Sequence, residues 1–238
     1  MRNTPITRMT EGFPVGHFVG YQAAGIFQSQ AEVFSYINNN GDPLQPKAKP
    51  GDLKFVDVNG DGVIDSKDIT DIGSPWPAHI LGLTLSARYK GFDVSVILSA
   101  QLGHQIFRAY ERSDITFTNY QTFWEDRWTE TNPSSELPRL VTTDPNNNQR
   151  PSSFYVEDAS FLRVRNLQIG YSLSPKLLQR MPIRDLRIYL SANNLLTLTR
   201  YRGFDPDIGT NGWILDTGID KGYYPSNQTI GGGVRITL

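Results

Sequence analysis

The sequence predicts an all-β fold of antiparallel, up-and-down strands, of the kind that form transmembrane β-barrels with long extracellular loops. Three observations lead to this prediction. Polar and apolar residues alternate along several segments, most clearly over 79–102, and this is the period of a β-strand. The alternating segments are about ten residues long, the length of a tilted strand that crosses a membrane. Long and short connections between these segments also alternate along the chain, as they do in outer-membrane barrels.

The chain opens with irregular strand and turn. Residues 11–28 are rich in glycine and aromatic side chains. Residues 29–37 predict a short helix capped by Ser29, and the Asn- and Gly-rich stretch 38–43 ends it.

The stretch 51–73 contains the most specific local motif, a calcium-type loop. Counted from Asp57, oxygen-bearing side chains stand at loop positions 1, 3, 5, 9 and 12, with glycine at position 6, which is the ligand spacing of an EF-hand loop. The predicted ligands are Asp57, Asn59, Asp61, the backbone carbonyl of Val63, Asp65 and Asp68. Four carboxylates this close together repel one another unless a cation lies among them. We therefore expect Ca²⁺ in a structural role; the alternative is a polar turn that binds no metal.

The clearest strands follow this loop. Residues 79–102 predict a hairpin with its turn at Lys90-Gly91. From 103 to about 158 the pattern gives way to a long loop, in which 123–128 predicts a helical turn. Alternation returns over 158–198 as a second strand pair, and over 226–238 as a terminal strand. Between the two strands of the second pair, Ser174-Pro175 predicts an N-cap and the start of a helical turn that reaches Met181.

The order of the connections predicts an orientation. Long connections span 29–78, 103–158 and 201–224, whereas 90–91 and 175–185 are short. Outer-membrane barrels have short periplasmic turns and long extracellular loops, so the calcium-type loop is expected outside the cell and Leu238 at the periplasmic end. A soluble β-sandwich also alternates, but loops of roughly 50 residues are uncommon in compact domains.

Composition excludes several classes of function. The 238 residues carry a net charge of −1 and include no cysteine, which argues against nucleic-acid binding and excludes disulfides and thiol chemistry. No apolar run is long enough for a transmembrane helix, and residues 1–9 lack the apolar core of a signal peptide. If the protein is exported, its signal sequence lies upstream and this chain is a fragment.

The sequence contains no catalytic constellation. It has no Gly-x-Ser-x-Gly elbow, no His-Glu-x-x-His motif and no phosphate-binding loop. The adjacent acid pairs Glu125-Asp126 and Glu157-Asp158 are poor acid/base couples, because neighbouring side chains point apart. We therefore predict no enzymatic activity and no catalytic residues.

Two groups of side chains leave their roles open. Phe123, Trp124 and Trp128 could stack on sugars, pack within the loop, or belong to an aromatic belt at a membrane interface. Arginines at 88, 163, 165 and 187 stand in strand segments. Facing a barrel lumen, they would avoid the lipid, where an arginine costs about 2–4 kcal/mol, and would guide a solute or pair with carboxylates of the barrel's plug.

Five stretches, in order along nearly the whole chain, resemble the C-terminal part of SusC/RagA-type TonB-linked outer-membrane proteins. They cover 12–28, 50–75, 127–139, 158–171 and 193–225, and include Gly12-Phe13-Pro14-Val15-Gly16, Asn193-Asn194-Leu195-Leu196-Thr197 and Gly203-Phe204-Asp205-Pro206. Two positions depart from the family pattern. Ala24 stands where aspartate is usual, and Leu238 stands where the family usually ends in phenylalanine.

The resemblance implies that residues 1–238 are the C-terminal segment of a roughly 22-stranded barrel in the outer membrane of a Gram-negative cell. It also implies partners: a SusD-like surface lipoprotein, and the TonB complex acting through an N-terminal part that this chain lacks. The function implied is import of oligosaccharides or peptides; substrate-binding residues are not identified. The alternative function is that of a calcium-stabilised extracellular β-domain that binds carbohydrate and mediates adhesion.

Overall fold

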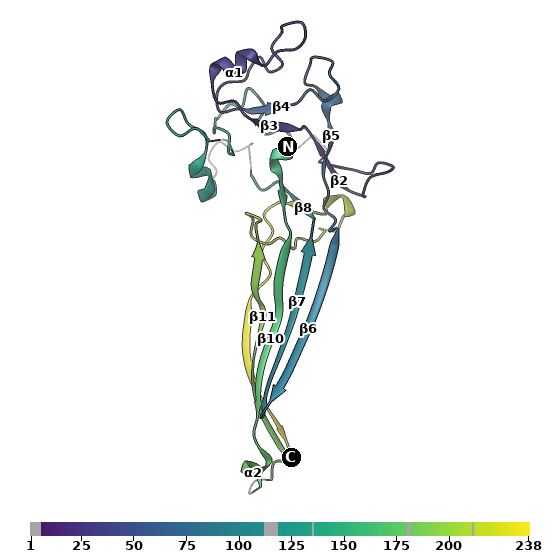
Figure 1. Ribbon diagram of the computed structural model, residues 1–238, viewed down its shortest axis with the longest axis vertical. Helices are drawn as coiled ribbons and strands as arrows, with labels where there is room; N and C mark the ends of the chain where they lie inside the picture. Colours follow the sequence, from purple (N-terminus) through teal and green to yellow (C-terminus); the bar gives the residue numbers. More distant parts are fainter. Residues whose placement is uncertain (1–5, 112–118, 135, 180–181, 211) are drawn as a thin grey trace. The chain divides into compact units, whose positions relative to one another are not determined.

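The computed structural model describes residues 6–111, 119–134, 136–179, 182–210 and 212–238, and they form an all-β fold (Figure 1). The chain divides into two units. Unit 1 comprises 1–75, 105–157 and 208–222, and unit 2 comprises 76–104, 158–207 and 223–238. None of the helices in the described ranges has the length and hydropathy needed to cross a membrane.

Unit 2 is built on a five-stranded antiparallel sheet, whose strands lie side by side in Figure 1. The strands are β6 (His79–Tyr89), β7 (Phe92–Leu102), β10 (Phe161–Ser172), β11 (Asp185–Thr199) and β13 (Thr229–Thr237). Their order in the sheet, β13-β11-β10-β7-β6, follows their order in the sequence. This is the up-and-down arrangement that the alternation predicts, and the sheet is open, with β6 and β13 at its edges.

The turn and a bulge set the register of this sheet. Lys90 and Gly91 join β6 to β7 with φ angles of 47° and 88°, as two-residue hairpin turns require. Pairing of β10 with both neighbours shifts between Val164 and Asn166. Ile97, which breaks the alternation of β7, pairs with Asn166 beside this shift, so the irregularity in the sequence coincides with the bulge.

The described residues of unit 1 form three small sheets. β1 (Thr7–Arg8), β2 (His17–Gly20) and β5 (Thr70–Gly73) form the first, in the order β1-β2-β5. β3 (Ala23–Ile26) pairs with β4 (Leu53–Phe55). In the third sheet, β8 (Gln105–Arg108) lies between β9 (Val156–Asp158) and β12 (Ile219–Asp220), and its pairing with β12 is parallel.

The helical elements are short. α1 (Gln30–Ser35) begins as predicted, with the Ser29 hydroxyl accepting the Glu32 N–H at 3.2 Å. The predicted turn at 123–128 is instead a 3₁₀ helix, η2 (Thr122–Asp126). α2 (Pro175–Leu178) starts with proline as predicted, but its end at Leu178 is earlier than expected and the Ser174 side chain makes no capping hydrogen bond; Met181 lies outside the described residues. The other 3₁₀ helices are η1 (Ser66–Asp68), η3 (Ser153–Tyr155) and η4 (Ile214–Asp216).

The core of unit 1 consists of small apolar clusters joined by a buried polar network around β4. One cluster contains Phe18, Phe107, Tyr155 and Ile219; another contains Ile26, Leu53, Phe55 and Trp128.

In the network, side-chain amides take the place of a neighbouring strand. Asn148 Oδ1 accepts the Leu53 N–H at 2.9 Å, and Gln45 Oε1 accepts the Phe55 N–H at 2.7 Å. This satisfies the backbone groups that the short strand would otherwise leave unpaired.

Candidate functional site

One face of the five-stranded sheet is apolar and exposed. A row across all five strands consists of Leu85, Val96, Leu167, Ala192 and Ile230, each opposite the next. Leu85 is 54% exposed and Ile230 is 71% exposed. Soluble proteins rarely expose apolar patches that run across a whole sheet, so this face is suited to an apolar environment.

Aromatic residues end the apolar face near the Lys90-Gly91 turn. Tyr89, Phe92 and Tyr171 are consecutive partners across β6, β7 and β10. The rings of Phe92 and Tyr171 lie 4.6 Å apart between centroids. Aromatic girdles of this kind border the apolar band of membrane barrels.

The opposite face of the sheet is polar and carries an ion pair that spans three strands. Arg187 on β11 donates to Asp93 on β7, with Nε 2.9 Å from Oδ1. Gly170 of β10 lies between these strands, and a Cβ there would be 2.5 Å from the Arg187 guanidinium. Arg88 shares this face, since it pairs directly with Asp93 across β6 and β7. The register therefore places Arg88 and Arg187 on the polar face.

The other two strand arginines, Arg163 and Arg165, bind aspartates of the loop that follows β11. Arg163 is buried and donates to Asp205, while Arg165 donates to Asp207 at 2.6 Å. Burial raises the pKa of Asp205, but N–H donors from Ser226 and Asp207 and the Arg163 guanidinium outweigh it and leave the pKa below its usual value. The structure thus pairs these two arginines with carboxylates of this chain's own loop, a role that the sequence did not predict. The sequence does not single out either aspartate as an arginine partner; Asp205, but not Asp207, lies within the Gly-Phe-Asp-Pro stretch.

The calcium-type loop curls around Asp57. The Asp57 carboxylate accepts the N–H groups of Gly60 and Gly62 at 2.8 and 2.7 Å, and both glycines have positive φ. Asp68 is fully buried and accepts N–H groups from Val58 at 2.8 Å and Asp65 at 2.8 Å. The two ends of the predicted ligand set therefore both bind backbone of the same loop.

A lysine supplies positive charge within the loop. Lys67 Nζ lies 3.0 Å from Asp61 Oδ2 and 3.9 Å from Asp65 Oδ2. Its ammonium group lowers the pKa of Asp61, and Asp61 in turn raises the pKa of Lys67. Asn59 Nδ2 donates to the same Asp61 oxygen at 3.1 Å. In the part of the chain that the structure describes, no three His, Asp or Glu side chains are grouped as a metal site; calcium binding therefore remains a prediction.

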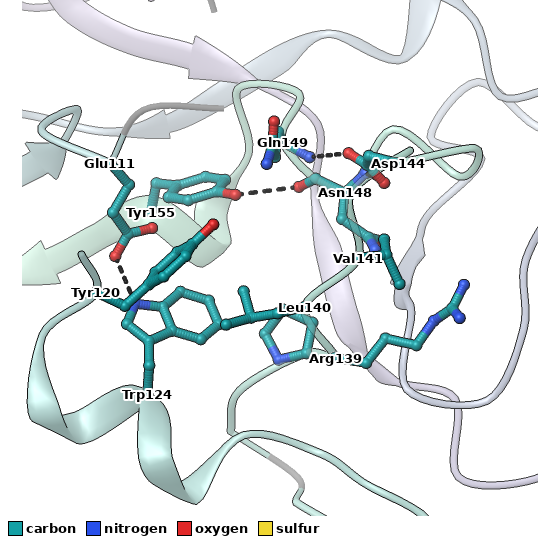
Figure 2. A pocket seen from close by; sticks show the side chains of 11 residues that line it. Glu111, Tyr120, Trp124, Arg139, Leu140, Val141, Asp144, Asn148, Gln149 and Tyr155 are labelled. Atoms are coloured by element: carbon teal, nitrogen blue, oxygen red, sulfur yellow. Dashed lines mark hydrogen bonds between the residues drawn. The ribbon is translucent and has the colours of Figure 1, made fainter. Parts of the chain in front are cut away.

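A narrow cavity in unit 1 is lined by aromatic and polar side chains (Figure 2). Figure 2 shows Trp124 and Tyr120 on one side, and Tyr155 with Asn148 on the other. Glu111 accepts a hydrogen bond from Trp124 Nε1 at 2.9 Å, and burial raises the pKa of this carboxyl although Arg108 opposes the shift. The cavity volume is about 30 Å³, room for one or two waters, and far below the volume that a sugar ring or peptide needs.

The aromatic cluster near this cavity is packed into the fold. Trp124 and Trp128 are both buried. Trp128 Nε1 donates to Gln28 Oε1 at 3.1 Å, and its ring lies where a Cβ on Gly51 would be only 2.4 Å away. Of the three roles considered for these side chains, loop packing is the one that the structure supports for Trp124 and Trp128.

The chain is similar to TonB-dependent receptors over nearly its whole length, although no protein-family model matches it. It is 31% identical over 242 residues to TonB-dependent receptor P3 of Formosa agariphila, covering 99% of this chain and 23% of that protein. It is 29% identical over 215 residues to TonB-dependent receptor SusC of Bacteroides thetaiotaomicron, covering 90% of this chain and 19% of the relative.

A solved structure agrees with this likeness. The structure of the RagAB peptide transporter superposes with a TM-score of 0.70 at 25% identity, covering 98% of this chain and 24% of the matched one. The chain thus spans about a quarter of the length of the proteins it matches. In sequence and in fold, the chain is therefore similar to a segment of SusC/RagA-type TonB-dependent receptors.

Proposed function

We propose that this chain forms the C-terminal strands and the extracellular loops of an outer-membrane, TonB-dependent importer that takes up oligosaccharides or peptides with a SusD-like surface lipoprotein. The observation that carries the proposal is the exposed apolar face of the five-stranded sheet, with polar residues on its other face. In a barrel wall the apolar face contacts lipid and the polar face lines the lumen.

The open edges of the sheet fit a wall that continues beyond this chain. Among the residues that the structure describes, β6 and β13 each have one neighbour. Membrane barrels leave no edge unpaired, because lipid offers backbone groups no hydrogen bonds. We propose that further strands of the same receptor pair with both edges. The TonB complex would then act through the N-terminal part of the receptor.

Substrate and partner are proposed from the relatives. The RagAB protein that this chain matches in structure is a peptide transporter, which supports peptides as one substrate class; the likeness to SusC supports a SusC-type importer. The proposal therefore includes both oligosaccharides and peptides as substrates. The lipoprotein partner follows from the same resemblance.

The alternative, a soluble adhesion domain stabilised by calcium, accounts less well for the sheet. Such a domain would have to bury the face that contains Leu85, Leu190 and Ile230, and these side chains are 54%, 64% and 71% exposed. A lipid environment makes this exposure favourable, whereas water makes it costly.

We also propose that the calcium-type loop binds Ca²⁺ outside the cell. Its donors are carboxylate, amide and carbonyl oxygens, which suit a hard cation, and the predicted ligands are those from Asp57 to Asp68. Lys67 Nζ lies 3.0 Å from Asp61 Oδ2 and is a competing cation, so calcium would have to displace this ion pair to bind Asp61. Bound calcium would stabilise the loop without taking part in transport chemistry.

Paired arginine substitutions in the full-length receptor test the membrane assignment. Leu85 lies on the apolar face and Ser86 on the polar face of the same strand. We expect Leu85→Arg to cost about 2–4 kcal/mol near the bilayer centre and to reduce the amount of folded receptor in the outer membrane. Ser86→Arg should leave assembly nearly unchanged. Equal effects of the two substitutions would contradict the proposal.

A further inference from the structure

The polar face of the five-stranded sheet contains a hollow near the Lys90-Gly91 turn, which we call the basic hollow. Its volume is about 630 Å³, within the range of about 300–1,000 Å³ that is usual for ligand pockets. Each strand of the sheet, from β6 to β13, contributes at least one lining residue. The basic hollow is therefore formed by the sheet as a whole, and it lies entirely within unit 2.

Positive charge exceeds negative charge in the basic hollow. The described residues that line it include one carboxylate, Asp93, and four basic side chains, those of Arg88, Lys90, Arg187 and Arg235. Arg187 Nε donates to Asp93 at 2.9 Å, and Arg88 is the direct partner of Asp93 across β6 and β7. One carboxylate thus faces two arginines, which leaves positive charge in excess.

The register of the sheet adds to this excess. Arg187 and Arg235 are directly opposite each other across β11 and β13, where side chains come close and like charges are destabilising. Arg235 also donates to Asp185 at 3.0 Å, but its side chain is 63% exposed, and ion pairs at exposed sites contribute little. An anion bound beside the two arginines would offset their repulsion.

The donors in the basic hollow match an oxyanion. Guanidinium groups are planar forks that bind carboxylate and phosphate oxygens through two parallel hydrogen bonds. The hydroxyls of Ser86 and Ser95 and the amide of Gln168 line the same hollow and supply neutral donors. A cation would be repelled here, and an apolar ligand would remove water from the arginines without replacing its hydrogen bonds.

We propose that the basic hollow binds an oxyanion inside the barrel. Two sources carry this chemistry: an acidic side chain from another part of the same receptor, or an anionic oligosaccharide or acidic peptide in transit. The first source is available because the proteins that this chain matches are about four times as long. The inference rests on the proposed position of the polar face in the lumen, and the experiment separates the two.

The experiment measures the melting temperature of the full-length receptor in detergent and chloride buffer, with and without inorganic phosphate. Arg235→Gln and Asp185→Asn form a matched pair. Both remove the ion pair between these two residues, but only Arg235→Gln removes a cation from the basic hollow.

If the hollow is open to solutes, phosphate should raise the melting temperature of the unmodified receptor and of Asp185→Asn, and raise that of Arg235→Gln less. If the receptor's own carboxylate occupies the hollow, phosphate should have no effect, and Arg235→Gln should melt below Asp185→Asn. Either difference should shrink in about 1 M salt, where the Debye length falls to about 3 Å. Equal melting temperatures of the two variants, with and without phosphate, would overturn the anion site.

A photoreactive residue identifies the source and tests the membrane position separately. With p-benzoylphenylalanine in place of Ser95, a crosslink to an Asp- or Glu-containing segment of the receptor indicates the receptor's own carboxylate, whereas a crosslink to a segment without acidic residues would overturn the proposal. With the same residue in place of Leu85, on the apolar face, we expect capture of lipid in nanodiscs. Failure to capture lipid at Leu85 would overturn the proposed membrane position, whereas capture of lipid together with equal melting of the two variants would overturn the anion site alone.

Discussion

At the scale of single residues, Gly170 makes room for an ion pair that reaches across β10 from β11 to β7. The Arg187 guanidinium passes over it to Asp93, two strands away from Arg187. Glycine is costly inside a strand, so its presence near the end of β10 has a packing reason. Alternation identified the strand but gave no sign of this pair, because its members are 94 residues apart.

Gly170→Val tests this role of the glycine. A Cβ at 170 would lie 2.5 Å from the Arg187 guanidinium and 2.7 Å from Asp93 Oδ1, so the ion pair must separate. We expect destabilisation, measured as a lower melting temperature of the full-length receptor in detergent. Gly82→Val is the control, since a Cβ there meets nothing within 4 Å. A comparable loss in both variants would show that valine in a strand, and not the ion pair, is responsible.

Asp205 predicts a dependence on pH. Hydrogen bonds in the folded protein outweigh burial and lower the pKa of this carboxyl. A lowered folded-state pKa means that the ionised group stabilises the fold above the ordinary aspartate pKa of about 3.9, and that this stabilisation is lost as pH falls through the folded-state pKa.

The measurement compares Asp205→Asn with the unmodified receptor by thermal unfolding at several pH values. At neutral pH, we expect the variant to be less stable by about 1–3 kcal/mol, because buried Arg163 loses the nearer of its two aspartate partners. The difference should shrink in acid, where the unmodified carboxyl is also protonated. Asp216→Asn, which removes a surface ion pair with Lys221, should show little effect at any pH. If the difference in stability between Asp205→Asn and the unmodified receptor stays constant with pH, the stabilising charge does not belong to Asp205.

At the scale of elements, patterns within short windows predicted most of the structure. The hairpin over 79–102 matches β6 and β7 because the two-residue period is a local property of each arm. Ser29 predicted the start of α1 for the same reason. The bulge in β10 could not be located in this way, since a bulge depends on the register of two neighbouring strands.

The calcium-type loop is the element with the clearest metal prediction. We expect calcium to increase the hydrogen-exchange protection of residues 52–72 in the full-length receptor, with a dissociation constant on the order of 10⁻⁴–10⁻³ M, as in extracellular modules. A chelator should reverse the increase. Asp61→Asn should weaken the response, because Asp61 is a predicted ligand with little role in the core, whereas Asp42→Asn, outside the loop, should preserve it. Protection that does not respond to calcium or chelator would end the calcium proposal.

At the scale of the whole molecule, the proposed orientation places the long connections outside the cell and the short ones in the periplasm. The chain contains no cysteine, so single cysteines can report on sidedness. On intact cells, a membrane-impermeant maleimide should label Asn39→Cys in a long connection but not Lys176→Cys in a short one. Both residues are exposed, and both should react once the outer membrane is permeabilised. Labelling of Lys176→Cys alone on intact cells would indicate the opposite orientation.

Strand positions, the hairpin turn and the oxygen spacing of the calcium-type loop were all readable from the chain, because each depends on residues that are close in sequence. The sequence did not predict which arginine pairs with which carboxylate. It also did not predict that Trp124 and Trp128 are buried. The hydrogen bonds from the side chains of Gln45 and Asn148 to the backbone of β4 could not be predicted from the sequence either. Asn148 and Leu53, for example, are 95 residues apart. Such contacts depend on how distant segments pack, and a one-dimensional pattern contains no information on that packing. The exposed apolar face combines both kinds of information: alternation defines its residues, and only the register across five strands joins them into one surface.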